Sequence, residues 1–288
     1  MRHFVELCGD TPLIKISDRI YGKLETYNPT GSVKDRMISY VVHKALQRGD
    51  IKGNTILCDA TSGNTGIALS AVAASLGLRC VIFMPKNMSF ERKQMMSVYG
   101  AEIIDAPDDD FAKAIEMRDS FLASEKSSWS PRQFSNADNV ECHLLKTAPE
   151  ILSNVESLGL SWASFIHGSG TGGTIEGIRR FINMNGLKTK VVMTQPSESP
   201  HGIQGIADGK EFLAKDADMD QIIKINTSTA IERAKRFASE TGTLVGISSG
   251  ANIYAAEKWA IDNPGSDNEV IITMLCDRGE RYMSVFQA

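Results

Sequence analysis

Residues 27–36 read Tyr-Asn-Pro-Thr-Gly-Ser-Val-Lys-Asp-Arg and decide how the first half of the chain is organised. Asn28-Pro29 and Thr30-Gly31 are turn-forming pairs, and the apolar residues after Lys34 recur at helical spacing. Lys34 is therefore predicted at a loop-to-helix junction, where free backbone N–H groups and the helix dipole disfavour a positive charge. An amine placed there gives up its proton more readily and becomes a candidate Schiff-base nucleophile. For this segment alone, an exposed lysine opening a helix is the alternative.

Composition excludes several classes of protein. The 288 residues carry a net charge of −4, with 42% hydrophobic and 23% charged residues, so neither a nucleic-acid footprint nor a polybasic membrane patch is present. The N-terminus shows no signal-peptide run, and no apolar stretch is long enough to span a bilayer. The five scattered cysteines lack Cys-x-x-Cys spacing, which indicates neither a disulfide framework nor a zinc site. We expect a cytoplasmic protein that binds no nucleic acid and no membrane.

Short apolar runs alternate with helical patterns along the chain. Strands are predicted at 13–16, 22–25, 55–58, 80–84, 102–104, 164–167, 191–193, 221–225 and 270–275, and helices at 67–76, 89–99, 111–122, 175–184, 229–241 and 251–260, with a surface loop at 124–131. Such alternation is typical of parallel sheets covered on both faces. The fold class is therefore α/β, with two three-layer α/β/α domains and mostly parallel sheets. The predicted domains are a smaller one at 36–146 and a larger one made of 1–35 and 147–288.

Residues 168–174, Gly-Ser-Gly-Thr-Gly-Gly-Thr, follow a predicted strand and open a predicted helix. Successive backbone N–H groups and the Thr171 and Thr174 hydroxyls would form a cup for a phosphate. The spacing also fits Gly-x-Gly-x-x-Gly, so a dinucleotide site is an alternative. However, the next strand ends Met-Thr-Gln-Pro at 193–196, without the acid that would hold a ribose. A tight turn without a ligand is the remaining interpretation.

A second polar cluster lies at 61–66, Thr-Ser-Gly-Asn-Thr-Gly, again between a strand and a helix. Hydroxyls, an amide and free N–H groups at a helix N-terminus favour a carboxylate. Taken alone, the segment could equally be an elaborate helix cap. Together with the phosphate cup and Lys34, it predicts a ligand that carries an amino-acid carboxylate.

Five motifs occur in order along the chain: residues 28–36, 61–66, Gln-Phe-Ser-Asn at 133–136, 168–174 and Gly-Ile-Ser-Ser-Gly-Ala at 246–251. With these motifs the chain resembles the cysteine synthase (O-acetylserine sulfhydrylase) family of fold-type II pyridoxal phosphate enzymes, which have the tryptophan synthase β-like fold and include relatives of cystathionine β-synthase. The resemblance covers nearly the whole chain. Residues 276–282, Cys-Asp-Arg-Gly-Glu-Arg-Tyr, are similar to the B-type cysteine synthases.

The resemblance implies roles for individual residues. Lys34 would form the Schiff base with pyridoxal 5′-phosphate and act as acid and base at the substrate Cα. Asn64 would bind the 3′-oxygen of the cofactor, and Ser248 would meet its pyridine nitrogen. The residues implied for the phosphate are Gly170, Thr171, Gly172, Gly173 and Thr174. Those implied for the substrate are Thr61, Ser62, Thr65, Gln133 and Gly205.

The implied reaction is a β-replacement that forms L-cysteine from O-acetylserine and sulfide through an aminoacrylate. A hydroxyl at the ring nitrogen makes a weaker electron sink than a carboxylate, which suits elimination of a leaving group from Cβ. No metal is required. The resemblance further implies a homodimer, and it leaves a complex with serine acetyltransferase open. Closure of the smaller, mobile domain over the substrate is expected because the carboxylate loop at 61–66 and the phosphate cup fall in different predicted domains.

Other activities stay open from the residues alone. Within the same cofactor class they are a cystathionine β-synthase-like enzyme and a serine or threonine dehydratase. Outside it they are a regulatory homologue without turnover and, least supported, a nicotinamide-dependent dehydrogenase.

The chain departs from the B-type pattern in one segment. Ala207-Asp208 follows Gln-Gly-Ile at 204–206, where B-type members carry an arginine pair. An acid there would disfavour anionic substrates such as O-phosphoserine or thiosulfate. Cys276 has two interpretations, a thiol at the mouth of the site or a small hydrophobic residue that ends a core strand.

Overall fold

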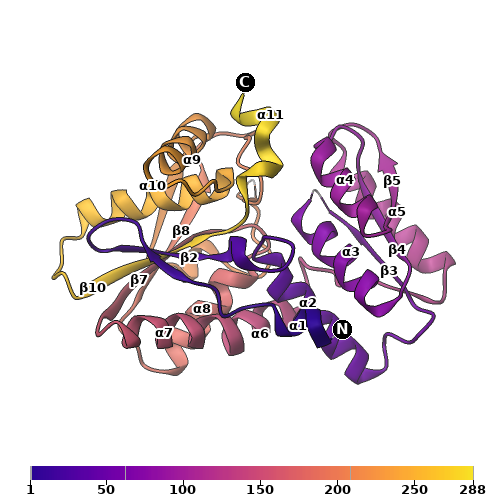
Figure 1. Cartoon of the computed structure of the whole chain (residues 1–288), viewed down its shortest axis with the longest axis horizontal. Helices are drawn as coiled ribbons and strands as arrows, with labels where there is room; N and C mark the ends of the chain where they lie inside the picture. The colour runs from indigo at the N-terminus through magenta and orange to yellow at the C-terminus, as the bar shows by residue number, and fades with distance from the viewer. Residues whose placement is uncertain (1, 62, 208, 288) are drawn as a thin grey trace. The chain divides into compact units, whose positions relative to one another are not determined.

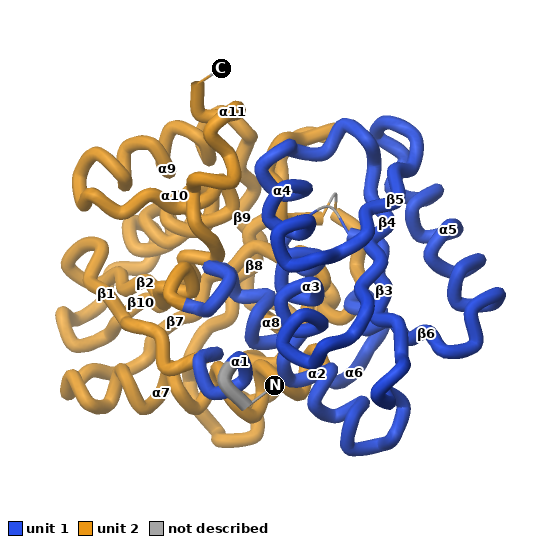
Figure 2. Tube along the Cα trace, turned by 45° about the vertical axis from the view of Figure 1, so that its right-hand side comes forward, with its two compact units in different colours: residues 1–8, 28–138 blue, residues 9–27, 139–288 orange. Residues whose placement is uncertain are grey.

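The computed structural model describes residues 2–61, 63–207 and 209–287. The chain divides into two compact units, shown in different colours in Figure 2. Unit 1 comprises residues 1–8 and 28–138, and unit 2 comprises residues 9–27 and 139–288. The sequence placed all of 1–35 with the larger domain. In the structure only 9–27 of that segment belong to it, because strands β1 and β2 pair into its sheet.

Unit 1 is built on a parallel sheet with the strand order β5-β4-β3-β6. Alternate strand residues face opposite sides of a sheet, and the packing follows this rule. Leu57 and Ile82 pack with α2, α3 and α4 on one face, whereas Cys58 and Phe83 pack with α5 on the other. The strands are β3 (Ile56–Ala60), β4 (Cys80–Pro85), β5 (Glu102–Ala106) and β6 (Ser128–Trp129), and the helices are α1 (Arg2–Glu6), α2 (Lys34–Arg48), α3 (Asn64–Leu76), α4 (Phe90–Val98) and α5 (Phe111–Ser124).

Unit 2 is built on a six-stranded sheet with the order β1-β2-β10-β7-β8-β9, in which the β1–β2 pair is antiparallel and the other pairs are parallel. Figure 1 shows α9 and α10 on one side of this sheet and α7 and α8 on the other. The strands are β1 (Leu13–Lys15), β2 (Ile20–Leu24), β7 (Ser161–Gly168), β8 (Lys190–Pro196), β9 (Gln221–Ile225) and β10 (Glu269–Leu275). The helices are α7 (Ala148–Ser157), α8 (Gly173–Met184), α9 (Thr227–Thr241), α10 (Ile247–Asp262) and α11 (Met283–Phe286). The predicted α/β class with mostly parallel sheets is confirmed.

A helical segment that sequence periodicity did not predict lies between Gln133 and β7. α6 (Ala137–Cys142) continues through a π-helical turn at His143–Thr147 into α7. A second difference is β6, which lies inside the predicted loop at 124–131 and pairs with β3. Trp129 of this two-residue strand packs against the core cluster of unit 1, so tertiary contacts rather than local pattern place it.

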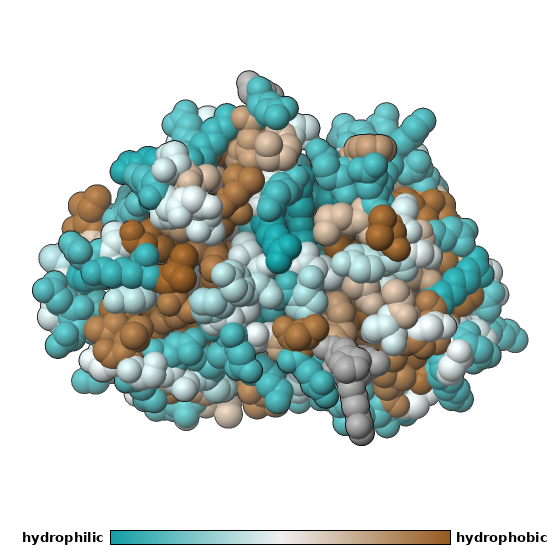
Figure 3. All heavy atoms as spheres, viewed as in Figure 1, coloured by the Kyte–Doolittle hydropathy of each residue, from teal (hydrophilic) through white to brown (hydrophobic). Residues whose placement is uncertain are grey.

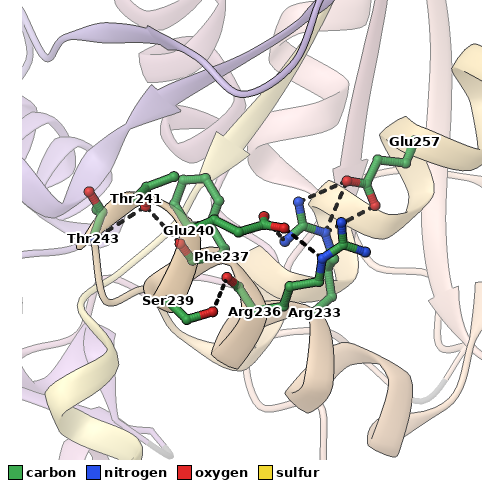
Figure 4. Close-up of polar contacts among 8 residues, drawn as sticks. All are labelled: Arg233, Arg236, Phe237, Ser239, Glu240, Thr241, Thr243 and Glu257. Carbon is green, nitrogen blue, oxygen red and sulfur yellow. Dashed lines mark hydrogen bonds and ion pairs between the residues drawn. The ribbon is translucent and has the colours of Figure 1, made fainter.

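Helices α9 and α10 are joined by the ion pair drawn in Figure 4. The Arg233 guanidinium, almost fully buried, donates to the Glu257 carboxylate at 2.8–3.0 Å. A fork-to-carboxylate pair of this kind fixes orientation as well as distance. It therefore holds α10, whose first turn contains Ser248, against its neighbour.

The face in Figure 3 shows hydrophobic residues in separate patches among hydrophilic ones. Single exposed hydrophobic residues such as Val98, Ile261 and Met184 are ordinary at protein surfaces. Within the described residues, no helix combines the length and the hydropathy needed to cross a membrane.

Candidate functional site

Lys34 is the first residue of α2, at the junction that the turn residues predict. The preceding turn is closed by a hydrogen bond from the Gly31 N–H to the Asn28 carbonyl at 2.8 Å, with Gly31 at a φ of 84°. The buried Asp35 carboxylate accepts from the Thr30 N–H at 2.7 Å and from the Thr30 hydroxyl. The segment is therefore locked on both sides of Lys34, and the half-buried lysine extends from a fixed backbone.

Lys23 is a second lysine in a buried position, and sequence reasoning did not single it out. It is fully buried in β2, and its Nζ contacts a Glu150 carboxylate oxygen at 2.5 Å and Asn154 Oδ1 at 2.7 Å. These partners lie on α7, so Lys23 ties this helix to the sheet of unit 2. A lysine held in this way has a structural role.

The loop at 61–66 gathers the predicted carboxylate-binding residues of unit 1. The Thr65 hydroxyl donates to Gln133 Oε1 at 2.7 Å, and the Gly63 N–H donates to Thr61 Oγ1 at 3.2 Å. Asn64 is the first residue of α3 and Thr65 the second, so both stand at the end of the helix where backbone N–H groups are free. The structure thus brings Gln133 to a loop almost seventy residues earlier in the chain. Ser62, also predicted here, lies outside the described residues.

Arg92 on α4 is a further residue at this loop, and no sequence pattern indicated it. A Cβ added to Gly63 would lie 2.7 Å from Arg92 Cδ and 2.9 Å from its Nε, and one added to Gly66 would lie 2.7 Å from Met96 Sδ. Arg92 is only 3% exposed, so a buried cation packs directly behind the loop. A guanidinium beside a helix N-terminus adds to the positive potential of the first N–H groups, which favours an anion at the loop. The sequence predicted both the glycines' loop and the helix at 89–99, but not that this helix packs on the glycines.

The glycine-rich loop 168–174 leads from β7 into α8 as predicted, with Gly172 at a φ of 84° directly before the first helical residue. A Cβ on Gly170 would lie 2.4 Å from the Gly205 carbonyl oxygen. Gly205, at a φ of 98°, in turn lies against Ser248, whose Oγ would be 3.5 Å from an added Cβ. The structure therefore brings Gly170, Gly205 and Ser248 together in unit 2.

The chemistry of this loop fits a phosphate ester. Hydrogen-bond donors at this loop are the Thr171 and Thr174 hydroxyls and the first N–H groups of α8. The cap residue, Gly172, has no side chain that could cover them. The acid in the first turn, Glu176, accepts from Arg179 at 2.8 and 3.0 Å and from Arg180 at 2.6 Å. Burial by itself would raise the pKa of Glu176, but these hydrogen bonds outweigh it and hold the pKa below its usual range. The two arginines thus neutralise the acid in the first turn of α8, which would otherwise oppose an anion.

Ser248 and Cys276 occupy different environments. Ser248 lies in the first turn of α10, which begins at Ile247, four residues before the predicted start. Cys276 directly follows β10 and is buried; its N–H donates to Ser249 Oγ at 2.8 Å, and its Sγ accepts from Asn252 Nδ2 at 3.4 Å. Of the two interpretations of Cys276, the structure favours the residue that ends a core strand.

Asn252 was also missed, although it connects two of the predicted motifs. Its Oδ1 accepts from the Gly168 N–H at 2.8 Å, and its Nδ2 donates to the Met274 carbonyl at 2.9 Å. One buried amide therefore joins the start of the glycine-rich loop to the end of β10. A buried amide satisfied at both ends fixes the spacing of the segments that it bridges.

Across residues 2–61, 63–207 and 209–287 no cluster of three or more histidine, cysteine, aspartate or glutamate side chains could hold a metal ion. Asp208, the acid predicted to bias the choice of substrate, lies outside the described residues.

Comparison with known proteins places this geometry in a family. The family described as pyridoxal-phosphate dependent enzymes matches residues 5–277. A cysteine synthase of Staphylococcus aureus is 36% identical over 98% of this chain and 95% of its own length. Among solved structures, an O-ureido-L-serine synthase has a TM-score of 0.91 at 32% identity, covering 98% of this chain and 93% of that one. An O-acetylserine-dependent cystathionine β-synthase from Helicobacter pylori has a TM-score of 0.90 at 32% identity, covering 98% and 96%. The chain therefore belongs to the family of pyridoxal-phosphate dependent enzymes, among the cysteine synthase-like members that its motifs resemble.

Proposed function

We propose that the protein is a cysteine synthase that converts O-acetylserine and sulfide to L-cysteine and acetate. The observation that carries this proposal is the likeness to cysteine synthases along nearly the whole chain, with a lysine at the first residue of α2 and a phosphate-type loop at the start of α8. The loop at 61–66 supports an amino-acid substrate, because its donors suit a carboxylate.

The residues divide into two groups by role. Lys34 would hold the cofactor at its aldehyde carbon, Asn64 would orient the ring, and Ser248 would meet the ring nitrogen. Residues 170–174 bind the phosphate. Thr61, Ser62, Thr65, Gln133 and Gly205 bind the substrate, with the Arg92 charge behind the loop favouring its carboxylate.

When bound, pyridoxal phosphate supplies an electron-withdrawing ring that stabilises negative charge at the substrate Cα. The chain supplies the rest. Lys34 Nζ, which the substrate amine would displace from the cofactor, would then be free to take the Cα proton. Acetate would leave from Cβ with the C–O electron pair, and hydrosulfide would add to the same carbon. Lys34 then returns a proton to Cα. Thr65 and Gln133 keep the carboxylate fixed during these transfers, which holds the Cα–H bond in one orientation.

The experiment that tests the proposal begins with cofactor binding. Borohydride reduction of the cofactor-saturated protein, followed by peptide mapping, is expected to find a pyridoxyl group on Lys34. Lys34→Ala should lose both this adduct and the visible absorbance, whereas the exposed-lysine control Lys52→Ala should keep both. An adduct at another lysine, or none, contradicts the assignment.

The choice of nucleophile separates the proposal from a second candidate. The H. pylori structure belongs to an enzyme that is named for O-acetylserine and cystathionine, which favours a β-replacement with a thiol as the alternative. Product analysis with O-acetylserine and either sulfide or homocysteine decides between them. We expect cysteine to form at least tenfold faster than cystathionine; the reverse order would assign the chain to the alternative.

We also propose that the active form is a cytoplasmic homodimer. The resemblance to the cysteine synthase family motivates the proposal. The net charge of −4 and the lack of a membrane-spanning helix within the described residues are compatible with it. Light scattering at micromolar concentration is expected to give twice the 31.4 kDa chain mass, and a monomer mass would refute it.

A further inference from the structure

Both threonine hydroxyls of the glycine-rich loop are held by one neighbouring segment. Asn139 Nδ2 donates to Thr171 Oγ1 at 3.0 Å, and His143 Nε2 lies 3.2 Å from Thr174 Oγ1. All four side chains are buried, with His143 only 2% exposed. Asn139 lies in α6, and His143 opens the π-helical turn that follows it, so the two side chains are one helical turn apart.

Two glycines on α8 allow this segment to approach. A Cβ on Gly173 would lie 2.0 Å from Asn139 Oδ1, and one on Gly177 would lie 2.7 Å from His143 Cβ. Glycine spacing on α8 therefore matches the spacing of Asn139 and His143. Single π-helical turns within helices often occur at functional sites, where they redirect side chains.

The bonds at Thr171 determine where its proton points. A hydroxyl carries one donor and two acceptor lone pairs. Thr171 Oγ1 accepts from Asn139 Nδ2 and from the Gly173 N–H at 3.3 Å, which uses both lone pairs. The Thr171 hydroxyl proton is then directed to an acceptor other than Asn139 or Gly173. A phosphate ester dianion offers acceptors only, so it complements this hydroxyl.

His143 controls the second hydroxyl through its tautomer. Its Nδ1 lies 2.9 Å from Thr147 Oγ1, and a neutral imidazole has one donor and one acceptor nitrogen. If Thr147 donates to Nδ1, then Nε2 carries the proton and donates to Thr174 Oγ1. The Thr174 proton then points to the phosphate. In the other tautomer, Thr174 would donate to the imidazole and present a lone pair to the anion.

We propose that His143 is a positioning residue that, as the Nε2-protonated tautomer set by Thr147, orients the Thr174 hydroxyl to donate to the cofactor phosphate. This inference rests on the proposed pyridoxal phosphate site. It concerns the direction of one proton and does not involve a bond between His143 and the cofactor. The hydrogen-bond series Thr147–His143–Thr174 thus lets the donor on the π-helical turn determine the direction in which the Thr174 hydroxyl donates at the start of α8.

The test compares variants by affinity for pyridoxal phosphate and for pyridoxal, which lacks the phosphate. His143→Leu removes the donor that directs the Thr174 hydroxyl toward the phosphate. It is expected to weaken pyridoxal phosphate binding about tenfold, the size expected when the hydrogen bond from Thr174 to the charged phosphate is lost. Its affinity for pyridoxal should stay within about twofold. His143→Gln, whose amide keeps a donor near the Nε2 position, should bind pyridoxal phosphate within about threefold of wild type. Thr147→Val should weaken binding severalfold, because Nδ1 loses the donor that fixes the tautomer.

Nitrogen NMR of histidine-labelled holoenzyme gives a readout independent of affinity. It should find the His143 proton on Nε2 in wild type, with the phosphorus resonance of the bound cofactor shifted in His143→Leu but not in His143→Gln. A proton on Nδ1, or equal losses for pyridoxal and pyridoxal phosphate in His143→Leu, overturns the inference. Absence of any cofactor on wild-type Lys34 would instead overturn the proposed function, so the two failures are distinguishable.

Discussion

Gly177→Ala gives the sharpest test of how α8 is held. In an ordinary helix, replacing glycine by alanine stabilises by about 1 kcal/mol. At Gly177 the added Cβ would lie 2.6 Å from the Val140 carbonyl oxygen, 2.7 Å from His143 Cβ and 2.8 Å from the Leu144 nitrogen. Two of these atoms belong to the backbone and cannot rotate away, so the overpacking cost falls toward the upper end of about 1–3 kcal/mol. The gain in helix propensity is therefore outweighed, and we expect a net destabilisation of about 1–2 kcal/mol.

Urea unfolding of the cofactor-saturated protein measures this difference. Gly53→Ala is the matched control, because nothing lies within 4 Å of a Cβ at that exposed glycine. The control should unfold within about 0.5 kcal/mol of wild type, the usual range for surface changes. A Gly177→Ala protein as stable as wild type, or more stable, would refute the close packing of α8 on the π-helical turn.

Three further predictions concern other parts of the chain. Burial raises the pKa of Asp59 to about 6 from 3.8, against the opposing effect of Arg118. Between about pH 4 and about pH 6 the native state therefore binds more protons than the unfolded state. As pH rises through this range, the free energy of unfolding of wild type should fall relative to that of Asp59→Asn by on the order of 2–3 kcal/mol. Parallel curves of unfolding free energy against pH for the two proteins would contradict this. Thr65→Val should raise KM for O-acetylserine about tenfold while leaving the cofactor absorbance intact, because the hydroxyl that donates to Gln133 Oε1 is lost. An unchanged KM would show that Thr65 is not part of the substrate site. Glu257→Gln should lower the free energy of unfolding by about 1–3 kcal/mol, because the buried Arg233 loses the nearer of its two charged partners among the described residues and keeps Glu240 at 3.5 Å. Thermal unfolding equal to that of wild type would exclude this role.

Local sequence patterns were sufficient for the parts of the site that are contiguous in the chain. The glycines and threonines at 168–174 predicted a strand–loop–helix junction, and β7 and α8 confirm it. The turn before Lys34 likewise predicted the start of α2. These features are local because backbone conformation and helix ends depend on a few neighbouring residues.

Tertiary contacts decided everything that connects segments far apart in sequence. Arg92 packs behind Gly63, and Asn252 bridges Gly168 to the end of β10. His143 meets Thr174 only because α6 and its π-helical turn pack on α8. None of these residues carries a local signal, since a buried arginine, asparagine or histidine is indistinguishable from an exposed one until its neighbours are known.

The sequence by itself determined the α/β class, the positions of the glycine-rich and lysine-bearing junctions, and the resemblance to pyridoxal phosphate enzymes. The tertiary structure alone decided which buried polar groups support those junctions and how the first 35 residues are shared between the units. The physical reason is the distance along the sequence over which each kind of interaction acts. Turns and helix starts follow from steric and dipole effects within a few residues, whereas hydrogen-bond partners and strand neighbours follow from how the whole chain packs.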